Sequence, residues 1–218
     1  LDRPGRSTWA AYNRDRPPPC QNDFELKPLF FLASTSAYRR ALLARLQLPF
    51  ECVAPAVDEQ RVAGETAEQM TTRLARLKAE AVARRHPDSV VIGSDQAAVR
   101  GAEILGKPGT VERCHQQLLQ SSAQSVAFLT AVHVIDGARG RSESHLDRTL
   151  VRFRSLDDAE IARYIAADQP LDCAGGFKAE SLGISLFEQI ESLDPTALTG
   201  LPLIWLCGAL RRAGIPVP

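Results

Sequence analysis

The chain has 218 residues, of which 44% are hydrophobic and 24% are charged, and its formal net charge is zero. These values are typical of a globular protein with one large domain or two small lobes. Proteins that bind nucleic acid by charge alone are usually more basic, so we expect no stable nucleic-acid partner.

The cysteines and the apolar runs argue against two further classes of protein. Five cysteines are widely spaced and odd in number, which is typical of reduced thiols rather than of a disulfide framework. No run approaches the about 18 apolar residues that span a bilayer. The sequence therefore predicts a cytoplasmic protein with no membrane partner.

The first 28 residues differ from the rest of the chain. They hold five prolines and scattered arginines, with almost no apolar periodicity. An apolar core of the kind found in signal peptides is absent from them. We predict a disordered or loosely attached N-terminal extension over residues 1–28 and one folded domain over residues 29–218.

From residue 29 onward, apolar runs alternate with amphipathic repeats. Short continuous apolar runs favour buried strands, and apolar residues at spacings of three and four favour helices. In the first half we predict strands over 29–34 and 50–55, helices that begin at Ser36 and over 66–86, and a strand over 89–95. Asp95 stands at the expected end of that last strand.

The second half continues the alternation. We predict helices over 111–120 and 157–167, long strands over 125–136 and 146–156 with a glycine-rich turn between them, and a C-terminal helix that stops at Gly214. Crossovers and a hairpin occur in the same chain. The predicted fold class is therefore α/β with a mixed sheet.

The stretch GAEILGKPG, from Gly101 to Gly109, resembles a phosphate-binding P-loop. A P-loop needs Ser or Thr after its lysine to hold magnesium. Lys107 is instead followed by Pro108, which has neither a hydroxyl group nor an N–H. The stretch therefore predicts a rigid turn that presents Lys107. On this local pattern alone, Lys107 is better interpreted as a solvated side chain than as a phosphate ligand.

A better phosphate site is the turn ASTSAYRR, residues 33–40. Its small residues expose backbone N–H groups at the start of a helix, where the helix dipole favours anions. Arg39 and Arg40 add guanidinium groups suited to phosphate oxygens. The alternative is an ordinary capped helix with two surface arginines.

Two other places could carry chemistry. Asp95 follows a buried strand, and a carboxylate there could hold a metal or act as a general base, although a simple turn aspartate is the alternative. The segment 172–183 is glycine-rich and polar, and it contains Lys178 and Glu180. It is either a binding loop or a plain surface loop.

Seven segments together resemble one family in their order and spacing. They are LASTSAYRRALLARL (32–46), VDE (57–59), RLARLKA (73–79), GSDQ (93–96), EILGKPGT (103–110), DCAGGFKAESLGISLFE (172–188) and DPTALTGLPLIWL (194–206). These segments are similar to those of the Maf family of nucleoside triphosphate pyrophosphatases, over about residues 29–214. The resemblance implies an elongated mixed sheet with flanking helices, as in inosine triphosphatases, and two lobes around a cleft.

The resemblance also implies an activity and a set of working residues. The family splits a nucleoside triphosphate into a monophosphate and pyrophosphate with a divalent metal, Mg²⁺ or Mn²⁺, and is often a homodimer. On this basis we predict Asp95 as the catalytic base, with Glu59 and Asp95 as metal ligands. The predicted substrate-binding residues are Ser34, Tyr38, Arg39, Arg40, Lys78, Gln96, Lys107, Lys178 and Glu180.

Three positions resemble the family branch that acts on 7-methyl-GTP. The branch similar to dTTP/UTP pyrophosphatases has Arg, Thr and Gln where this chain has Tyr38, Gln96 and Glu180. A 7-methylated guanine is positively charged, so an aromatic face and a carboxylate would both favour it. The alternatives are a dTTP/UTP or broad-specificity house-cleaning pyrophosphatase, and a non-catalytic regulator of septum formation.

Overall fold

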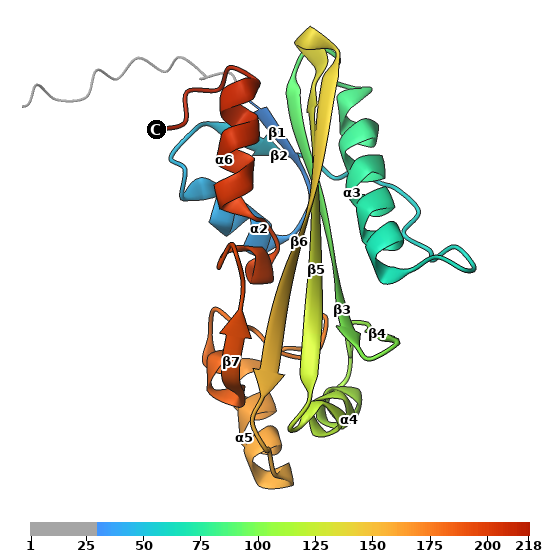
Figure 1. Cartoon of the computed structure of the whole chain (residues 1–218), viewed down its shortest axis with the longest axis vertical. Coiled ribbons are helices and arrows are strands. Elements are labelled where there is room, and N and C mark those ends of the chain that lie inside the picture. Colours follow the sequence, from blue (N-terminus) through green and yellow to red (C-terminus); the bar gives the residue numbers. More distant parts are fainter. Residues whose placement is uncertain (1–29) are drawn as a thin grey trace, which may run out of the picture.

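A mixed sheet forms the centre of the molecule, as a computed structural model of residues 30–218 shows (Figure 1). The predicted extension over residues 1–28 lies outside the described residues. The sheet has seven strands in the order β2-β1-β3-β5-β6-β7, with β4 paired to β3. The strands are β1 (Phe30–Ala33), β2 (Phe50–Cys52), β3 (Val90–Arg100), β4 (Glu103–Leu105), β5 (Ser125–Asp136), β6 (Arg141–Phe153) and β7 (Phe187–Glu191).

Parallel and antiparallel pairs occupy different parts of this sheet. β1 pairs in parallel with β2 and β3, through crossovers that contain the helices α2 (Ala37–Ala44) and α3 (Ala67–Ala83). β3, β5, β6 and β7 pair in antiparallel fashion. The strands β3, β5 and β6, of 11, 12 and 13 residues, run nearly the whole length of the molecule.

The upper lobe in Figure 1 consists of β1, β2, α2, α3 and α6 (Leu203–Arg212) around one end of the long strands. On one face, α2 and α6 pack on a buried cluster that includes Phe30, Ile92 and Val132. On the other face, α3 lies directly on Gly93, where a Cβ atom would come within 2.2 Å of the carbonyl oxygen of Ala75. Glycine at this position therefore sets how closely α3 approaches the sheet.

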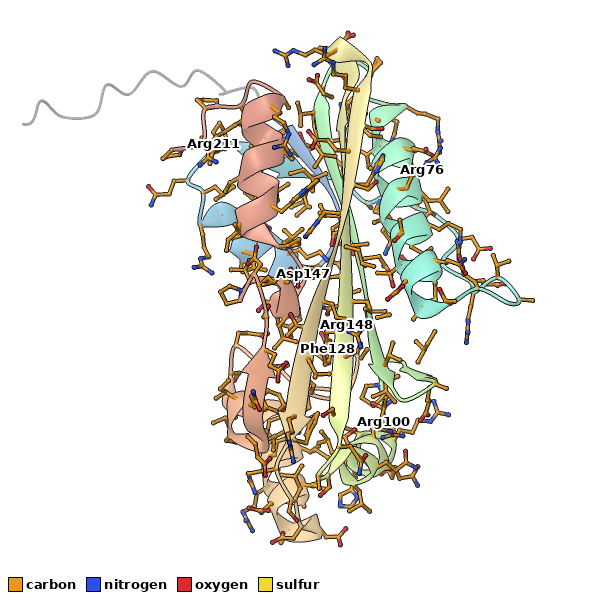
Figure 2. All side chains as sticks on the ribbon, viewed as in Figure 1. Arg76, Arg100, Phe128, Asp147, Arg148 and Arg211 are labelled. Carbon is orange, nitrogen blue, oxygen red and sulfur yellow. The ribbon has the colours of Figure 1, made fainter. Side chains whose placement is uncertain are left out.

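The lower lobe consists of α4 (Val111–Ser121), α5 (Asp158–Asp168), β4 and β7 around the other end of the strands. Phe128, Phe153, Phe177 and Phe187 pack edge to face with centroid distances of 4.8–5.6 Å. Figure 2 shows Phe128 on the central strands, whereas Arg76 and Arg211 lie on the outer helices. Each lobe thus has its own apolar core, and the long strands join the two.

The predicted α/β class with a mixed sheet is confirmed, and most predicted elements occur. The prediction that a strand ends at Asp95 is wrong, because β3 continues to Arg100 with Asp95 paired to Ala131 of β5. The strand predicted over 146–156 begins earlier, at Arg141, and ends at Phe153. β4 and β7 were not predicted from sequence. Within residues 30–218, no helix has the length and apolar character to cross a membrane.

Candidate active site

The edge of β3 is interrupted where the two lobes meet. β1 pairs with Val90–Gly93, and β4 pairs with Ala98–Arg100 on the same edge. The residues between these pairings, 94–97, have no strand partner on that side. The chain leaving β1 passes through Ser34 into α2 at this point, so loop residues and strand residues meet there.

Asp95 lies in this interruption and faces α3. Side chains alternate along a strand, so Asp95 shares the face of Gly93, on which α3 packs. Lys78 of α3 places its Nζ 2.7 Å from Oδ1 of Asp95 and 3.1 Å from Oε1 of Glu59. The side chains of Lys78 and Asp95 are 7% and 10% exposed, whereas Glu59 is 57% exposed. One buried ammonium group therefore joins two predicted metal ligands.

Burial and neighbouring charges have opposing effects on the pKa values of Asp95 and Arg39. Burial raises the pKa of Asp95 above its ordinary value, although Lys78 and Arg39 lower it and Glu59 adds to the increase. Burial also lowers the pKa of Arg39, while the charges of Asp95 and Glu59 oppose that change. Two cations and two carboxylates are thus close enough to influence each other, as chemistry on a polyphosphate requires.

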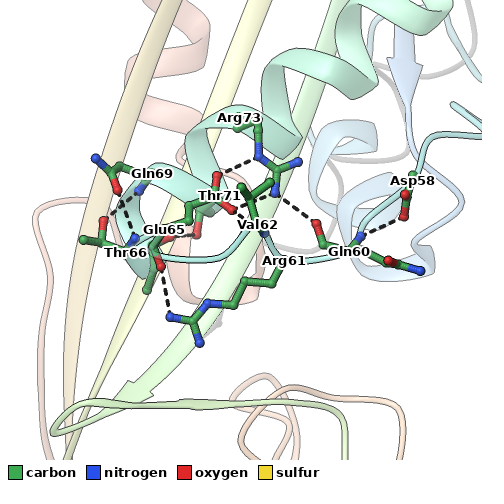
Figure 3. A network of polar contacts seen from close by, with 10 residues as sticks. Asp58, Gln60, Arg61, Val62, Glu65, Thr66, Gln69, Thr71 and Arg73 are labelled. Atoms are coloured by element: carbon green, nitrogen blue, oxygen red, sulfur yellow. Dashed lines mark hydrogen bonds and ion pairs between the residues drawn. The ribbon is translucent and has the colours of Figure 1, made fainter.

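The loop that carries Glu59 is held to α3 by a polar network (Figure 3). Arg73 binds both carboxylate oxygens of Glu65, at 2.6 and 2.8 Å, and also donates to the carbonyl oxygen of Gln60. Thr66 and Gln69 form a reciprocal capping box at the start of the helix. These contacts fix residues 60–66 and so restrict the position of Glu59 beside Lys78.

The predicted phosphate loop is ordered by its own hydroxyl groups. Ser36 caps α2 as predicted, since its Oγ accepts from the N–H of Arg39 at 3.4 Å. The buried Ser34 Oγ accepts from the N–H of Ser36 at 3.1 Å. Arg39 is partly buried and donates from Nε to the carbonyl oxygen of Gly200 at 3.1 Å, whereas Arg40 is exposed. The structure thus separates the two arginines, which the sequence treats alike.

Tyr38 faces the loop 172–180 rather than the Lys78 cluster. Its hydroxyl group lies 3.6 Å from Sγ of Cys173, which is in turn 3.5 Å from Oδ1 of Asp172. Burial raises the pKa of Tyr38, and the nearby Cys173, Asp172 and Glu180 raise it further. Tyr38 and Cys173 are therefore in contact, and Glu180 is near enough to influence the pKa of Tyr38. The sequence points to this loop but not to Cys173, which only the fold identifies.

Three predicted substrate ligands are placed differently. Gln96 lies on the face of β3 opposite Asp95, and its amide group donates to Thr130 and to the carbonyl oxygens of Ala197 and Leu198. The ammonium group of Lys178 donates to the carbonyl oxygen of the last residue of α5, Asp168. Lys107 is exposed, on the loop between β4 and α4. Contact of these three with a substrate stays a prediction.

Glu59 and Asp95 have the chemistry expected of ligands for a hard divalent cation. Mg²⁺ is commonly held by one or two carboxylates together with water and substrate phosphates. Within the part of the chain that the structure describes, no group of three or more His, Cys, Asp and Glu side chains could hold a metal. The pair beside Lys78 fits a metal that depends on the substrate for its remaining ligands.

Comparisons with known proteins agree over most of the chain. A family profile described as "Maf-like protein" matches residues 29–213. A protein of Alkalilimnicola ehrlichii named 7-methyl-GTP pyrophosphatase is 53% identical over 191 residues, which is 88% of this chain and 96% of that protein. A protein of the same name from Xanthomonas axonopodis pv. citri is 54% identical over 192 residues, 88% of this chain and all of that protein. The solved structure of the Staphylococcus aureus Ham1 protein is 16% identical with a TM-score of 0.43, covering 71% of this chain and 88% of that one.

Proposed function

Because this chain belongs to the Maf-like protein family, as its motifs predict, we propose that it is a pyrophosphatase that hydrolyses 7-methyl-GTP to 7-methyl-GMP and pyrophosphate. The observation that carries the proposal is the buried contact between Lys78 and Asp95, with Glu59 and Arg39 beside it. Such a cluster can hold a polyphosphate and activate water at the same place. The four free thiols among the described residues are consistent with a cytoplasmic enzyme.

Asp95 is the general base in this proposal. Lys78 binds its Oδ1, which leaves Oδ2 to accept a proton from water. The water oxygen forms a bond to the α-phosphorus while the bond from that phosphorus to the bridging oxygen of pyrophosphate breaks. Arg39 and Lys78 neutralise the charge that develops on the departing pyrophosphate. The raised pKa of Asp95 makes it a stronger base than an ordinary aspartate.

A divalent metal held by Glu59 and Asp95 would add charge neutralisation at the phosphates. We expect a chelator to abolish pyrophosphate release, because Lys78 and Arg39 alone leave much of the negative charge of the substrate unbalanced. Added Mg²⁺ or Mn²⁺ should restore it. The measurement is the rate of pyrophosphate release before and after dialysis against chelator, and full activity in chelator would contradict a metal requirement.

Base recognition is assigned to Tyr38 and the loop 172–180. A cationic 7-methylguanine on the face of Tyr38 would gain a cation–π interaction of roughly 0.5–2 kcal/mol. Glu180 and Asp172 place negative charge near that ring. Neutral guanine lacks this benefit, so the arrangement favours the methylated base.

We therefore expect turnover of 7-methyl-GTP to exceed that of GTP, dTTP, UTP and ITP. The measurement is kcat/KM for pyrophosphate release across this panel at one metal concentration. Tyr38→Leu should lower kcat/KM for 7-methyl-GTP more than for GTP, because only the charged base loses the cation–π term. A preference for dTTP would overturn the substrate assignment, and no release from any of the five would overturn the enzymatic proposal.

A further inference from the structure

The carbonyl oxygen of Gly200 accepts hydrogen bonds from two side chains of the site. Ser94 Oγ donates to it at 2.9 Å, and Arg39 Nε donates to it at 3.1 Å. Ser94 is fully buried and directly precedes Asp95 in β3. One backbone atom, more than a hundred residues away in the chain, thus joins the phosphate loop to the strand of the catalytic residue.

Arg39 makes this contact with Nε, the side-chain nitrogen nearest to the backbone, and not with the two Nη atoms at the tip of the guanidinium group. Within residues 30–218, neither Nη atom of Arg39 makes a hydrogen bond or an ion pair with protein. The outer edge of the guanidinium group therefore keeps the paired donors that bind phosphate oxygens in bidentate fashion. Fixing Nε sets the direction in which those donors point.

Position 200 accepts no residue other than glycine without strain. Gly200 has a φ of 117°, which side-chain-bearing residues rarely adopt. A Cβ atom there would also lie 3.2 Å from Nε and 3.3 Å from Cγ of Arg39. The positive φ of Gly200 and the absence of a Cβ atom together allow the side chain of Arg39 to pack against this turn.

The turn is itself fixed to the sheet. Gln96 donates to the carbonyl oxygens of Ala197 and Leu198, and Thr130 Oγ1 donates to that of Ala197 at 2.9 Å. Both side chains lie on the face of the sheet opposite Asp95. The position of Gly200 is thereby tied to β3 and β5, the strands that carry and flank the catalytic aspartate.

We infer that Ser94, Gln96 and Gly200 are positioning residues for Arg39: the turn 197–200, held by the sheet, orients the guanidinium group toward the phosphates of the substrate. This inference rests on the proposed pyrophosphatase function. It assigns Gln96 an indirect role, through the turn, in place of direct contact with the nucleotide.

The test measures the affinity for inorganic pyrophosphate by calorimetry, together with KM and kcat for 7-methyl-GTP. Ser94→Ala should weaken pyrophosphate binding about fivefold, because the turn that orients Arg39 loses one of its hydrogen bonds to the sheet. Gly200→Ala should weaken pyrophosphate binding about tenfold or more, because it both strains the backbone of the turn and disturbs the orientation of Arg39. Ser94→Cys, which keeps a weak donor, should fall between wild type and Ser94→Ala. The control is Gly140→Ala, at a left-handed glycine with no neighbour within 4 Å, which should leave binding unchanged.

The decisive comparison repeats Ser94→Ala in an Arg39→Ala background. If Ser94 acts through Arg39, its effect on pyrophosphate binding disappears there, whereas a general structural effect persists. Persistence of the fivefold loss would overturn the inference while wild-type turnover still supports the proposed function. Absence of wild-type turnover would instead overturn the function. The Ser94 variants carry this test even if Gly200→Ala does not fold.

Discussion

Replacing Asp95 with Asn is expected to lower kcat for 7-methyl-GTP about 1,000-fold, within the range that a general base contributes. Asn keeps the size of the side chain but cannot take a proton from water. It also removes one of the two carboxylates that would hold the metal. Pyrophosphate release in single-turnover and steady-state assays would measure the loss.

The matched control is Asp88→Asn, in the exposed turn before β3, which should retain wild-type turnover. The Asp95→Asn variant should still fold, because Lys78 keeps its ion pair with Glu59 and the Asn side-chain oxygen can still accept a hydrogen bond from the ammonium group. Thermal unfolding would check this point. Full turnover by a folded Asp95→Asn variant would remove Asp95 from the mechanism.

Lys78→Met is expected to be the most destabilising substitution in the site, by about 3 kcal/mol in the free energy of unfolding. It leaves the buried carboxylate of Asp95 without its ion-pair partner. Glu59 loses the same partner, but its side chain is exposed, so this second loss adds little to the destabilisation. Turnover should also fall sharply, because the ammonium group near the phosphates is lost. Denaturant unfolding and pyrophosphate release would measure the two effects.

A double variant separates stability from catalysis. Lys78→Met with Asp95→Asn should recover most of the stability lost in Lys78→Met, since Asn carries no charge to leave unpaired. Its activity should stay low. Arg76→Met, on the same helix but in a surface ion pair with Glu80, should change neither quantity measurably. If the double variant were no more stable than Lys78→Met, the unpaired carboxylate would not be the cause.

Local pattern was sufficient to predict most elements but not their full extent. The strand over 125–136 was predicted with its observed bounds, because most of its residues are apolar and a glycine-rich turn follows it. β3 was predicted to end at Asp95, where its apolar run gives way to polar residues, and aspartate is unfavourable in strands. Pairing with β5 and the ion pair with Lys78 outweigh that preference. The three-residue β4 has too few side chains to give a periodic signal.

The contacts of the candidate site also fall into those that the sequence predicts and those that it does not. Contacts within one motif could be predicted, such as the cap of Ser36 on α2. Contacts between motifs could not, because their partners are far apart in sequence. Gly200 meets Arg39 across 161 positions, and Cys173 meets Tyr38 across 135. Sequence spacing holds no information about which glycine or cysteine completes such a pair.

The continuous strands β3, β5 and β6 have a consequence for how the molecule could select its substrate. Hinge closure needs a few backbone positions that absorb large changes in φ and ψ. Strands paired without interruption from one lobe to the other offer none at the junction. The distance between α2 in the upper lobe, which carries Arg39, and the loop 172–180 in the lower lobe is therefore set by these strands. In the proposed function, with phosphates at Arg39 and the base at the loop 172–180, we expect nucleotide entry and release to depend on loop and side-chain motion rather than on hinge closure.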